Sequence, residues 1–303
     1  MTRFLVSGLI NIETTLRIER FPLEYNPVNF PFFGVQSSVS GVGYNLAKAL
    51  SRLRNEVNLL ALTGKDDAAQ LVQAALQRDH IPAAGVLQRL EQTPQSVILY
   101  DWQGRRQIHT DLKDIQEQVY PPQQAEQALA ACDVAVLCNI NFSRPLLVKA
   151  RRMDKPVASD VHAISDLEDD YNRDFRQFAD ILFMSHERLP LPPDEWLRAV
   201  LAKYPARIVV IGLGENGCLL GERGRNEAEH IPAANIRPVQ NTIGAGDALF
   251  SAFLHCFFRG DSARVALQKA VVFASYKIGA VSAADGFLDA TGLEELYRRG
   301  QPA

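Results

Sequence analysis

The chain has 303 residues, of which 47% are hydrophobic, and its formal net charge is -3. It is long enough to bury a large core, and the small negative charge with no basic cluster excludes the pattern expected for binding nucleic acid or an anionic membrane. The four cysteines are scattered, unlike those of a zinc site or a disulfide framework. No apolar run is long enough to span a bilayer, and residues 4–10 lack a signal-peptide cleavage site. We expect a cytoplasmic protein that acts on small molecules.

Residues 3–7 are predicted to form a buried strand, and two polar side chains, Asn11 and Glu13, follow it closely. Ligands of α/β proteins collect beyond the carboxyl ends of strands, so both residues are candidates for binding a small molecule. The alternative is ordinary turn polarity, which places the same residue types in loops.

Two segments, at about residues 14–39 and 95–110, interrupt this pattern with strand-like alternation. The second segment is predicted to be a hairpin that turns at Gln103 and Gly104. We expect a small sheet with an apolar face that packs on a ligand or a partner subunit, the alternative being a hairpin on the main core. Aromatic residues in or near the first segment could stack on a nucleobase or line a dimer interface: Phe30, Phe32, Phe33 and Tyr44.

Residues 40–45 (Ser-Gly-Val-Gly-Tyr-Asn) open an amphipathic helix. Asn45 falls in its first turns, where its amide could bind sugar hydroxyls. The chain then alternates strands with helices, which predicts an α/β fold with a parallel sheet and, with no linker visible, one domain over residues 1–303. Polar residues at the strand ends are plausible neighbours of one cleft, although capping roles would also explain them: Asn139, Asn141, Asp160, His186 and Glu187.

Glycines 212, 214 and 217 follow a predicted strand and have the spacing of a dinucleotide-binding fingerprint. That fingerprint requires a helix next, whereas the apolar residues 218–220 run into Gly221 and read as a second strand. We therefore reject the fingerprint, and with it the main support for a nicotinamide-dependent dehydrogenase. A strand–turn–strand unit could still place its backbone against a nucleotide.

Residues 241–247 (Asn-Thr-Ile-Gly-Ala-Gly-Asp) lie directly before a long apolar run that is predicted to be a buried helix. Small residues at 244–246 and the free amides of a helix N-terminus favour a phosphate group. A carboxylate is a poor phosphate ligand, so Asp247 is predicted to be a general base that takes a proton from an attacking hydroxyl. The alternative is an acidic residue that only stabilises its helix dipole.

Four of these motifs, in this order, resemble the ribokinase-like (PfkB) family of carbohydrate and nucleoside kinases. Residues 241–247 match the Asp-Thr-x-Gly-Ala-Gly-Asp signature at every position but the first. Residues 40–45 are similar to the Gly-Gly-x-Gly-x-Asn substrate loop, residues 64–66 to a Gly-x-Asp motif, and residues 212–217 to the glycine turn on the nucleotide side. The resemblance covers essentially the whole chain.

The resemblance implies a three-layer α/β/α fold with a mostly parallel central sheet, a small β-sheet lid formed by the two extended segments, and ATP-dependent transfer of a γ-phosphoryl group to a hydroxyl of a small sugar or nucleoside. Asp247 would be the base, and the amides of Gly244, Ala245 and Gly246 an anion hole. Substrate hydroxyls would bind Asn11, Glu13, Gly41 and Asn45, and the nucleotide would bind Gly214, Gly217, Thr242 and Ser275. The resemblance also implies Mg²⁺ near Glu187, allows a monovalent cation such as K⁺, and predicts a homodimer through the lid.

Four positions depart from the family pattern: Glu13 replaces an aspartate, Ser40 a glycine, residues 185–188 an Asn-x-x-Glu motif, and Asn241 the leading aspartate of the signature. The extra methylene of Glu13 changes which hydroxyls it can reach, so the resemblance does not identify the sugar. A catalytically weak sugar- or nucleoside-binding sensor on the same fold is the alternative function. Asp247 favours the kinase, because a sensor has no need of a base.

Overall fold

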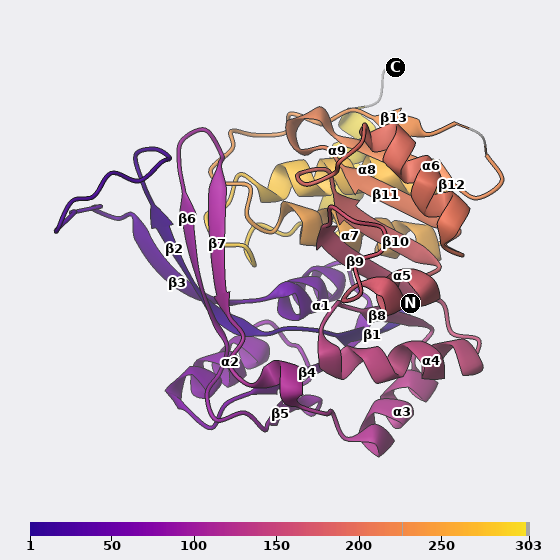
Figure 1. The fold of residues 1–303 in the computed structure, drawn as a ribbon, viewed down its shortest axis with the longest axis horizontal. Coiled ribbons are helices and arrows are strands. Elements are labelled where there is room, and N and C mark those ends of the chain that lie inside the picture. Colours follow the sequence, from indigo (N-terminus) through magenta and orange to yellow (C-terminus); the bar gives the residue numbers. More distant parts are fainter. Residues whose placement is uncertain (226, 301–303) are drawn as a thin grey trace.

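A nine-stranded sheet forms the centre of the molecule in the computed structural model, which describes residues 1–225 and 227–300 (Figure 1). The strand order is β13-β12-β11-β10-β9-β8-β1-β4-β5, parallel from β11 to β5, with β12 and β13 antiparallel. The strands are β1 (Arg3–Ser7), β4 (Glu56–Thr63), β5 (Val86–Gln88), β8 (Val134–Leu137), β9 (Val157–Ala163), β10 (Ile181–Ser185), β11 (Ile208–Gly212), β12 (Cys218–Glu222) and β13 (Glu229–Ile231).

Helices cover both faces of this sheet. Successive residues of a strand point to opposite faces, so the apolar strands present hydrophobic side chains on both sides. In β1, Phe4 and Val6 enter one apolar core and Leu5 enters the other. The first core is covered by α1 (Val42–Arg52), α2 (Asp67–Arg78), α7 (Ala245–Phe258), α8 (Ala263–Lys277) and α9 (Ala290–Arg299), and the second by α3 (Pro122–Ala131), α4 (Arg144–Arg152), α5 (Arg173–Phe178) and α6 (Pro193–Lys203). The predicted three-layer α/β/α fold is confirmed.

A second, four-stranded sheet stands off one side of this body and is called the lid below (Figure 1). It has the order β3-β2-β6-β7, with β2 and β6 parallel and the outer pairs antiparallel. Its strands are β2 (Asn11–Arg17), β3 (Val35–Ser40), β6 (Gln95–Tyr100) and β7 (Arg106–Asp111). They come from the two segments predicted to be extended, although β2 begins three residues earlier, at Asn11. That earlier start places Asn11 and Glu13 on one face of a strand.

The glycine turn after β11 leads into a strand. A short 3₁₀ turn, Gly214–Asn216, connects β11 to the antiparallel β12. Since no helix follows, the dinucleotide fingerprint is absent, as predicted from residues 218–221.

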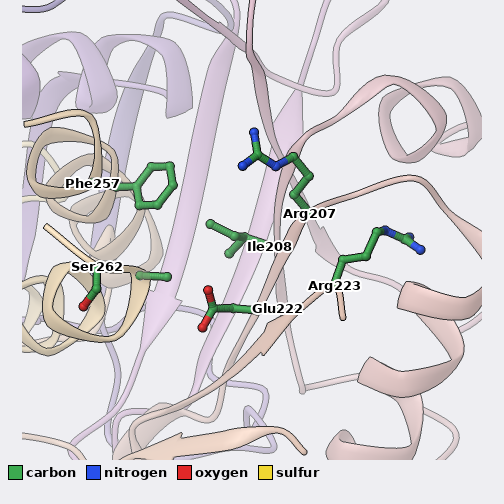
Figure 2. A pocket seen from close by; sticks show the side chains of 7 residues that line it. Arg207, Ile208, Glu222, Arg223, Phe257 and Ser262 are labelled. Atoms are coloured by element: carbon green, nitrogen blue, oxygen red, sulfur yellow. The ribbon is translucent and has the colours of Figure 1, made fainter. Parts of the chain in front are cut away.

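One surface pocket lies at the opposite end of β11 from this turn (Figure 2). Its lining includes Arg207 and Ile208, at the start of the strand, and none of the predicted site residues. The candidate site is therefore located from its side chains and backbone groups. In the described part of the chain, no helix is both long and apolar enough to cross a membrane.

Candidate active site

The predicted anion site is a backbone turn at the start of α7. Gly244 precedes the helix with φ 75°, and a Cβ atom on it would lie 2.5 Å from the carbonyl oxygen of Ala283. Both facts require glycine. The amide of Ala245 donates to the Thr242 carbonyl at 3.2 Å, whereas no acceptor in the described residues is in hydrogen-bonding geometry with the amides of Gly244, Gly246 or Asp247. A Cβ atom on Gly246 would meet no atom within 4 Å, so this end of the helix has room for an anion.

Asp247 lies in the first turn of α7 and is half-buried. Asn45, in the first turn of α1, donates its side-chain amide to Asp247 Oδ2 at 2.7 Å. Burial raises the pKa of the Asp247 carboxyl and Asp160 raises it further, against the lowering effects of Asn45, His162 and Lys277. A raised pKa makes this carboxylate a stronger base than an exposed aspartate, which suits proton abstraction.

Two of the departures from the family pattern contact each other. The Ser40 hydroxyl donates to Glu13 Oε2 at 3.0 Å and lies 3.4 Å from Asn45 Oδ1. A chain of polar contacts therefore runs from Glu13 through Ser40 and Asn45 to Asp247, in which the single Ser40 hydrogen is donated to either Glu13 or Asn45. Glu13 has a longer side chain than the aspartate it replaces, and the Ser40 hydroxyl holds its carboxylate in the site. A glycine at position 40 could not do this.

Two buried acceptors on β2 have no hydrogen-bond partner within the described residues, Asn11 Oδ1 and Glu13 Oε1. Asn11 is 2% exposed and Glu13 is 6% exposed. They are two residues apart and so share a face of the strand. Burial raises the pKa of Glu13, while the Ser40 hydrogen bond lowers it. Because unpaired buried acceptors are unfavourable, these oxygens fit a ligand that donates hydrogen bonds, as a hydroxyl does.

Gly41, a predicted substrate-binding residue, shapes the loop before α1 through its backbone. Its φ is 103°, and a Cβ atom there would lie 2.6 Å from the Leu9 carbonyl oxygen. Tyr44, three residues later, is fully buried and donates its hydroxyl to Asp79. The hypothesis that Tyr44 stacks on a nucleobase is therefore wrong, because a tyrosine on the inner face of α1 packs in the core.

Of the residues predicted to bind the nucleotide, Gly214 is exposed, whereas Gly217 and Ser275 already have contacts within the protein. Gly214 is exposed with φ 62°, whereas a Cβ atom on Gly217 would lie 2.1 Å from the Ile231 carbonyl oxygen, so this glycine holds the turn against β13. The Ser275 hydroxyl bonds to the carbonyl of Ala234 and accepts from the amide of Ile236 at 3.3 Å. Ser275 thus fixes the segment before the anion site, and its hydroxyl is already in use.

Arg106, at the start of β7, links the lid to the phosphate side. Its guanidinium donates to the hydroxyl of Thr242 and to Glu187 Oε1, both at 3.1 Å. Two other basic residues pair with nearby carboxylates of the same segment, Arg105 with Asp101 at 2.7 Å and Lys113 with Asp111 at 2.5 Å. Sequence reasoning could not distinguish Arg106 from these neighbours, because the contact depends on how the lid folds over the body.

Glu187 keeps half of its side chain exposed at the end of β10. Within residues 1–225 and 227–300, no group of three His, Cys, Asp or Glu side chains is placed to hold a metal ion. Magnesium in kinases is bound by one or two carboxylates together with substrate phosphates, so one accessible carboxylate fits it. In this structure the Glu187 carboxylate is also paired with the Arg106 guanidinium.

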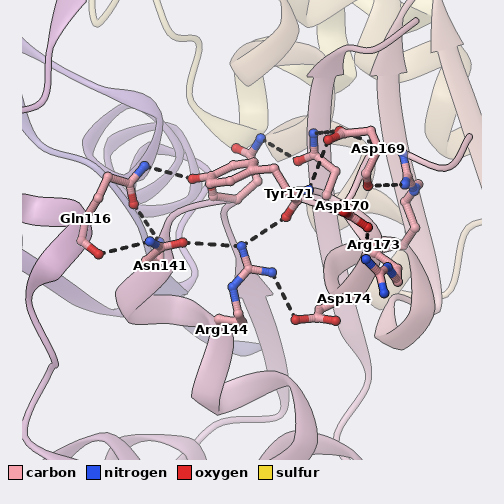
Figure 3. Close-up of polar contacts among 11 residues, drawn as sticks. Gln116, Asn141, Arg144, Asp169, Asp170, Tyr171, Arg173 and Asp174 are labelled. Carbon is pink, nitrogen blue, oxygen red and sulfur yellow. Dashed lines mark hydrogen bonds and ion pairs between the residues drawn. The ribbon is translucent and has the colours of Figure 1, made fainter. Parts of the chain in front are cut away.

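Two predicted neighbours of the cleft, Asn139 and Asn141, have hydrogen-bond partners in neighbouring loops. Asn139 donates to Asn172 at 3.0 Å. Asn141 donates to the backbone of Gln116 at 2.9 Å and accepts from Arg144 at 3.3 Å (Figure 3). These bonds tie loops together beside α4. These bonds give both asparagines a structural role, as the alternative prediction has it, and their place beside the cleft stays a prediction.

Lys277, which sequence reasoning missed, is fully buried at the end of α8. Its ammonium donates to the carbonyl oxygen of Ile243, one residue before Gly244. A lysine inside the apolar run 262–280 was the available signal. Buried lysines are rare without a partner or a role.

Comparison with known proteins identifies the family. Residues 1–290 match the model of the pfkB family carbohydrate kinases. The chain is 24% identical over 294 residues to an acarbose 7(IV)-phosphotransferase from an Actinoplanes species, covering 96% of this chain and 97% of that protein. A microbiome-derived acarbose kinase has the same fold with a TM-score of 0.86, 23% identity and coverage of 98% of this chain and 99% of that one. Ribokinase from Arabidopsis thaliana, solved with ribose and ATP, has the same fold with a TM-score of 0.79 and 19% identity. The match covers 98% of this chain and 99% of that one. The chain therefore belongs to the PfkB family of carbohydrate kinases.

Proposed function

We propose that this protein is an ATP-dependent kinase that transfers the γ-phosphoryl group to a hydroxyl of a small sugar or nucleoside, with Asp247 as general base. The observation that carries the proposal is the pairing of Asp247 with open backbone amides at the same helix end, next to a chain of polar side chains from β2, β3 and α1. A base and an anion site within one turn are the two parts that phosphoryl transfer to a hydroxyl requires.

In the proposed reaction, Asn45 and Asp247 hold the acceptor hydroxyl, and Asp247 takes its proton as the oxygen attacks phosphorus. The amides of Gly244 and Gly246, with a weaker share from Ala245, donate to the phosphoryl oxygens. Thr242 and the 214–217 turn would line the nucleotide. Mg²⁺ bound with ATP would neutralise phosphate charge, and Glu187 would hold it. A monovalent cation is not part of the proposed catalytic set.

On the acceptor side, the unpaired oxygens of Asn11 and Glu13 would each receive a hydroxyl. A ligand with several hydroxyls, such as a sugar, satisfies both, and the names of the relatives compared above support a carbohydrate. Tyr44 no longer favours a nucleoside, since it is buried. The catalytically weak sensor has no observation in its favour, because the base, its partner and the anion site are all present.

We also propose that the protein forms a homodimer through the lid. The loop between β2 and β3 projects away from the body (Figure 1) and exposes three phenylalanines, Phe30, Phe32 and Phe33, at 74%, 77% and 96%. Exposed aromatic clusters of this kind are typical of interaction surfaces.

The test of the kinase proposal is Asp247→Asn, assayed with ATP over a panel of sugars and nucleosides. The variant keeps the size of the side chain and loses the base, so turnover should fall at least about a hundredfold while ATP still binds. In the wild type, kcat/KM should fall as pH drops, with a midpoint above the usual aspartate pKa, because burial raises that of Asp247. Near-normal turnover of the variant would refute the assignment of the base.

A further inference from the structure

The buried Lys277 contacts the anion site from behind. Its ammonium donates to the Ile243 carbonyl, and that carbonyl belongs to the same peptide group as the Gly244 amide. The amide in turn has no acceptor within the described residues. Binding a cation to the oxygen of a peptide polarises it and makes its N–H a stronger donor. Lys277 therefore acts on the side of the peptide that faces away from the proposed phosphate.

The ammonium is charged although it is buried. Burial lowers the pKa of Lys277 to about 8, and the carboxylates of Asp247, Glu13 and Asp285 raise it, while Arg237 contributes to the lowering. At neutral pH most of the molecules thus carry a positive charge here. Two of the three carboxylates belong to the proposed site, so the ammonium also offsets negative charge where ATP must bind.

Three carbonyl oxygens near the anion site already have donors. Ile278 accepts from the amides of Gln240 and Asn241 at 2.8 and 3.2 Å, Val281 accepts from the Asn241 side chain, and Ile243 accepts from Lys277. A monovalent cation needs several such oxygens to replace its water shell. The Ile243 carbonyl oxygen, which shares its peptide group with the Gly244 amide, is therefore taken by the Lys277 ammonium and is not open to K⁺.

We propose, building on the kinase function above, that the Lys277 ammonium is a built-in monovalent cation that strengthens the Gly244 amide and makes the enzyme independent of K⁺. Lys277 touches no reacting atom in this arrangement and is a positioning residue. A charge that is fixed in place before the reaction does not have to move when the transferred group becomes more negative in the transition state. Such fixed charges are therefore effective in stabilising that state.

The first test compares wild-type enzyme in K⁺ and in tetramethylammonium, at equal ionic strength. We expect kcat to differ by less than about twofold, because the cation position is already filled. The Tm should also be equal in the two salts, since an ion that bound the native state would raise it. A kcat increase of about tenfold in K⁺, or a higher Tm specific to K⁺, would overturn the proposal.

The second test is Lys277→Met, which keeps most of the length of the side chain and removes the charge. We expect kcat to fall by about tenfold or more, with the KM for the sugar nearly unchanged. The Tm should stay equal or rise, because replacing a buried charge by an apolar group is often neutral or stabilising. A structural role would produce the reverse, a lower Tm with wild-type kcat.

The matched control is Lys269→Met on the same helix. Lys269 is also buried, at 8% exposure, but pairs with Asp261 at 2.8 Å and Glu294 at 2.7 Å, away from the site. This variant should lower the Tm and leave kcat unchanged. Equal loss of kcat in both lysine variants would contradict a specific effect of Lys277.

Chemical rescue completes the set. Lys277→Ala should lose turnover and recover part of it when methylammonium is added, whereas tetramethylammonium is too large for the space and should give no recovery. The proposal would be refuted if methylammonium restored no turnover to Lys277→Ala and if Lys277→Met also turned over at the wild-type rate without K⁺. A wild type that phosphorylates no sugar or nucleoside would instead refute the kinase function, and the Tm comparison would still report on the cation.

Discussion

The phosphate side and the substrate side of the candidate site are built from different parts of the chain. On the phosphate side, residues 241–247 present backbone amides, and a neighbouring loop around Ala283 packs directly on that backbone. On the substrate side, Asn11, Glu13 and Ser40 present side chains from two strands of the lid. The phosphate is common to all reactions of this type, whereas the acceptor varies. Backbone amides suit the phosphate, because they are present whatever the side chains are. Side chains suit the acceptor, because they can differ between proteins with different substrates.

The largest effect should come from the glycines of the phosphate side, which can be changed one at a time. Gly244→Ala places a Cβ atom 2.5 Å from the Ala283 carbonyl at a positive φ, so unfolding should become easier by at least about 2 kcal/mol, together with loss of activity. Thermal unfolding and kinase assays on the purified variant measure both.

Gly246→Ala is the matched control, because its methyl group meets no protein atom within 4 Å. Its stability should be unchanged or up to about 1 kcal/mol higher, since alanine favours a helix. The methyl group would enter the space proposed for the phosphoryl group, so kcat/KM for ATP should fall at least about tenfold. Full activity of this variant would show that the anion does not bind at this end of α7.

On the substrate side, Glu13→Gln should affect the sugar and spare ATP. The change removes a buried charge that is unpaired at Oε1, so kcat/KM for the sugar should fall about ten- to hundredfold, as for a lost hydrogen bond to a charged group. The KM for ATP should stay the same. Ser40→Ala removes only the hydroxyl that holds Oε2 and should cost about fivefold. Equal losses for sugar and ATP would contradict the division of the site into two sides.

The smallest effect on catalysis should come from the outer end of the lid. Replacing Phe32 and Phe33 by serine should convert a dimer into monomers, measured by sedimentation velocity. The kcat should change only a few-fold, because both side chains are exposed and neither is a site residue proposed above. Trp102→Ser is the control, since Trp102 is 74% exposed but lies in the other hairpin of the lid. A monomeric wild type, or a dimer that only the Trp102 change dissociates, would refute this interface.

Much of the phosphate side could be predicted from the order of residues, because it depends on local geometry. A glycine-rich turn, an apolar helix and an acid in its first turn are contiguous in residues 241–257, and helix physics alone links them to an anion. The same holds for the alternation of strands and helices, which predicts the parallel sheet, and for residues 218–221, which exclude the dinucleotide fingerprint.

The partners of these residues depend on contacts between distant segments, which no local pattern records. Ser40 and Glu13 are 27 residues apart, and Arg106 and Thr242 are 136 apart. The inner position of Tyr44 and the hydrogen bond of Asn141 to Gln116 follow from packing between elements, as does the contact of Lys277 with Ile243. The sequence thus specifies a helix end with open amides, suited to an anion, and a sheet to carry it, because hydrophobic periodicity and backbone freedom act over a few residues. Which side chains surround that helix end is set by the packing of α8 and the lid, because burial and hydrogen bonding are decided where segments meet.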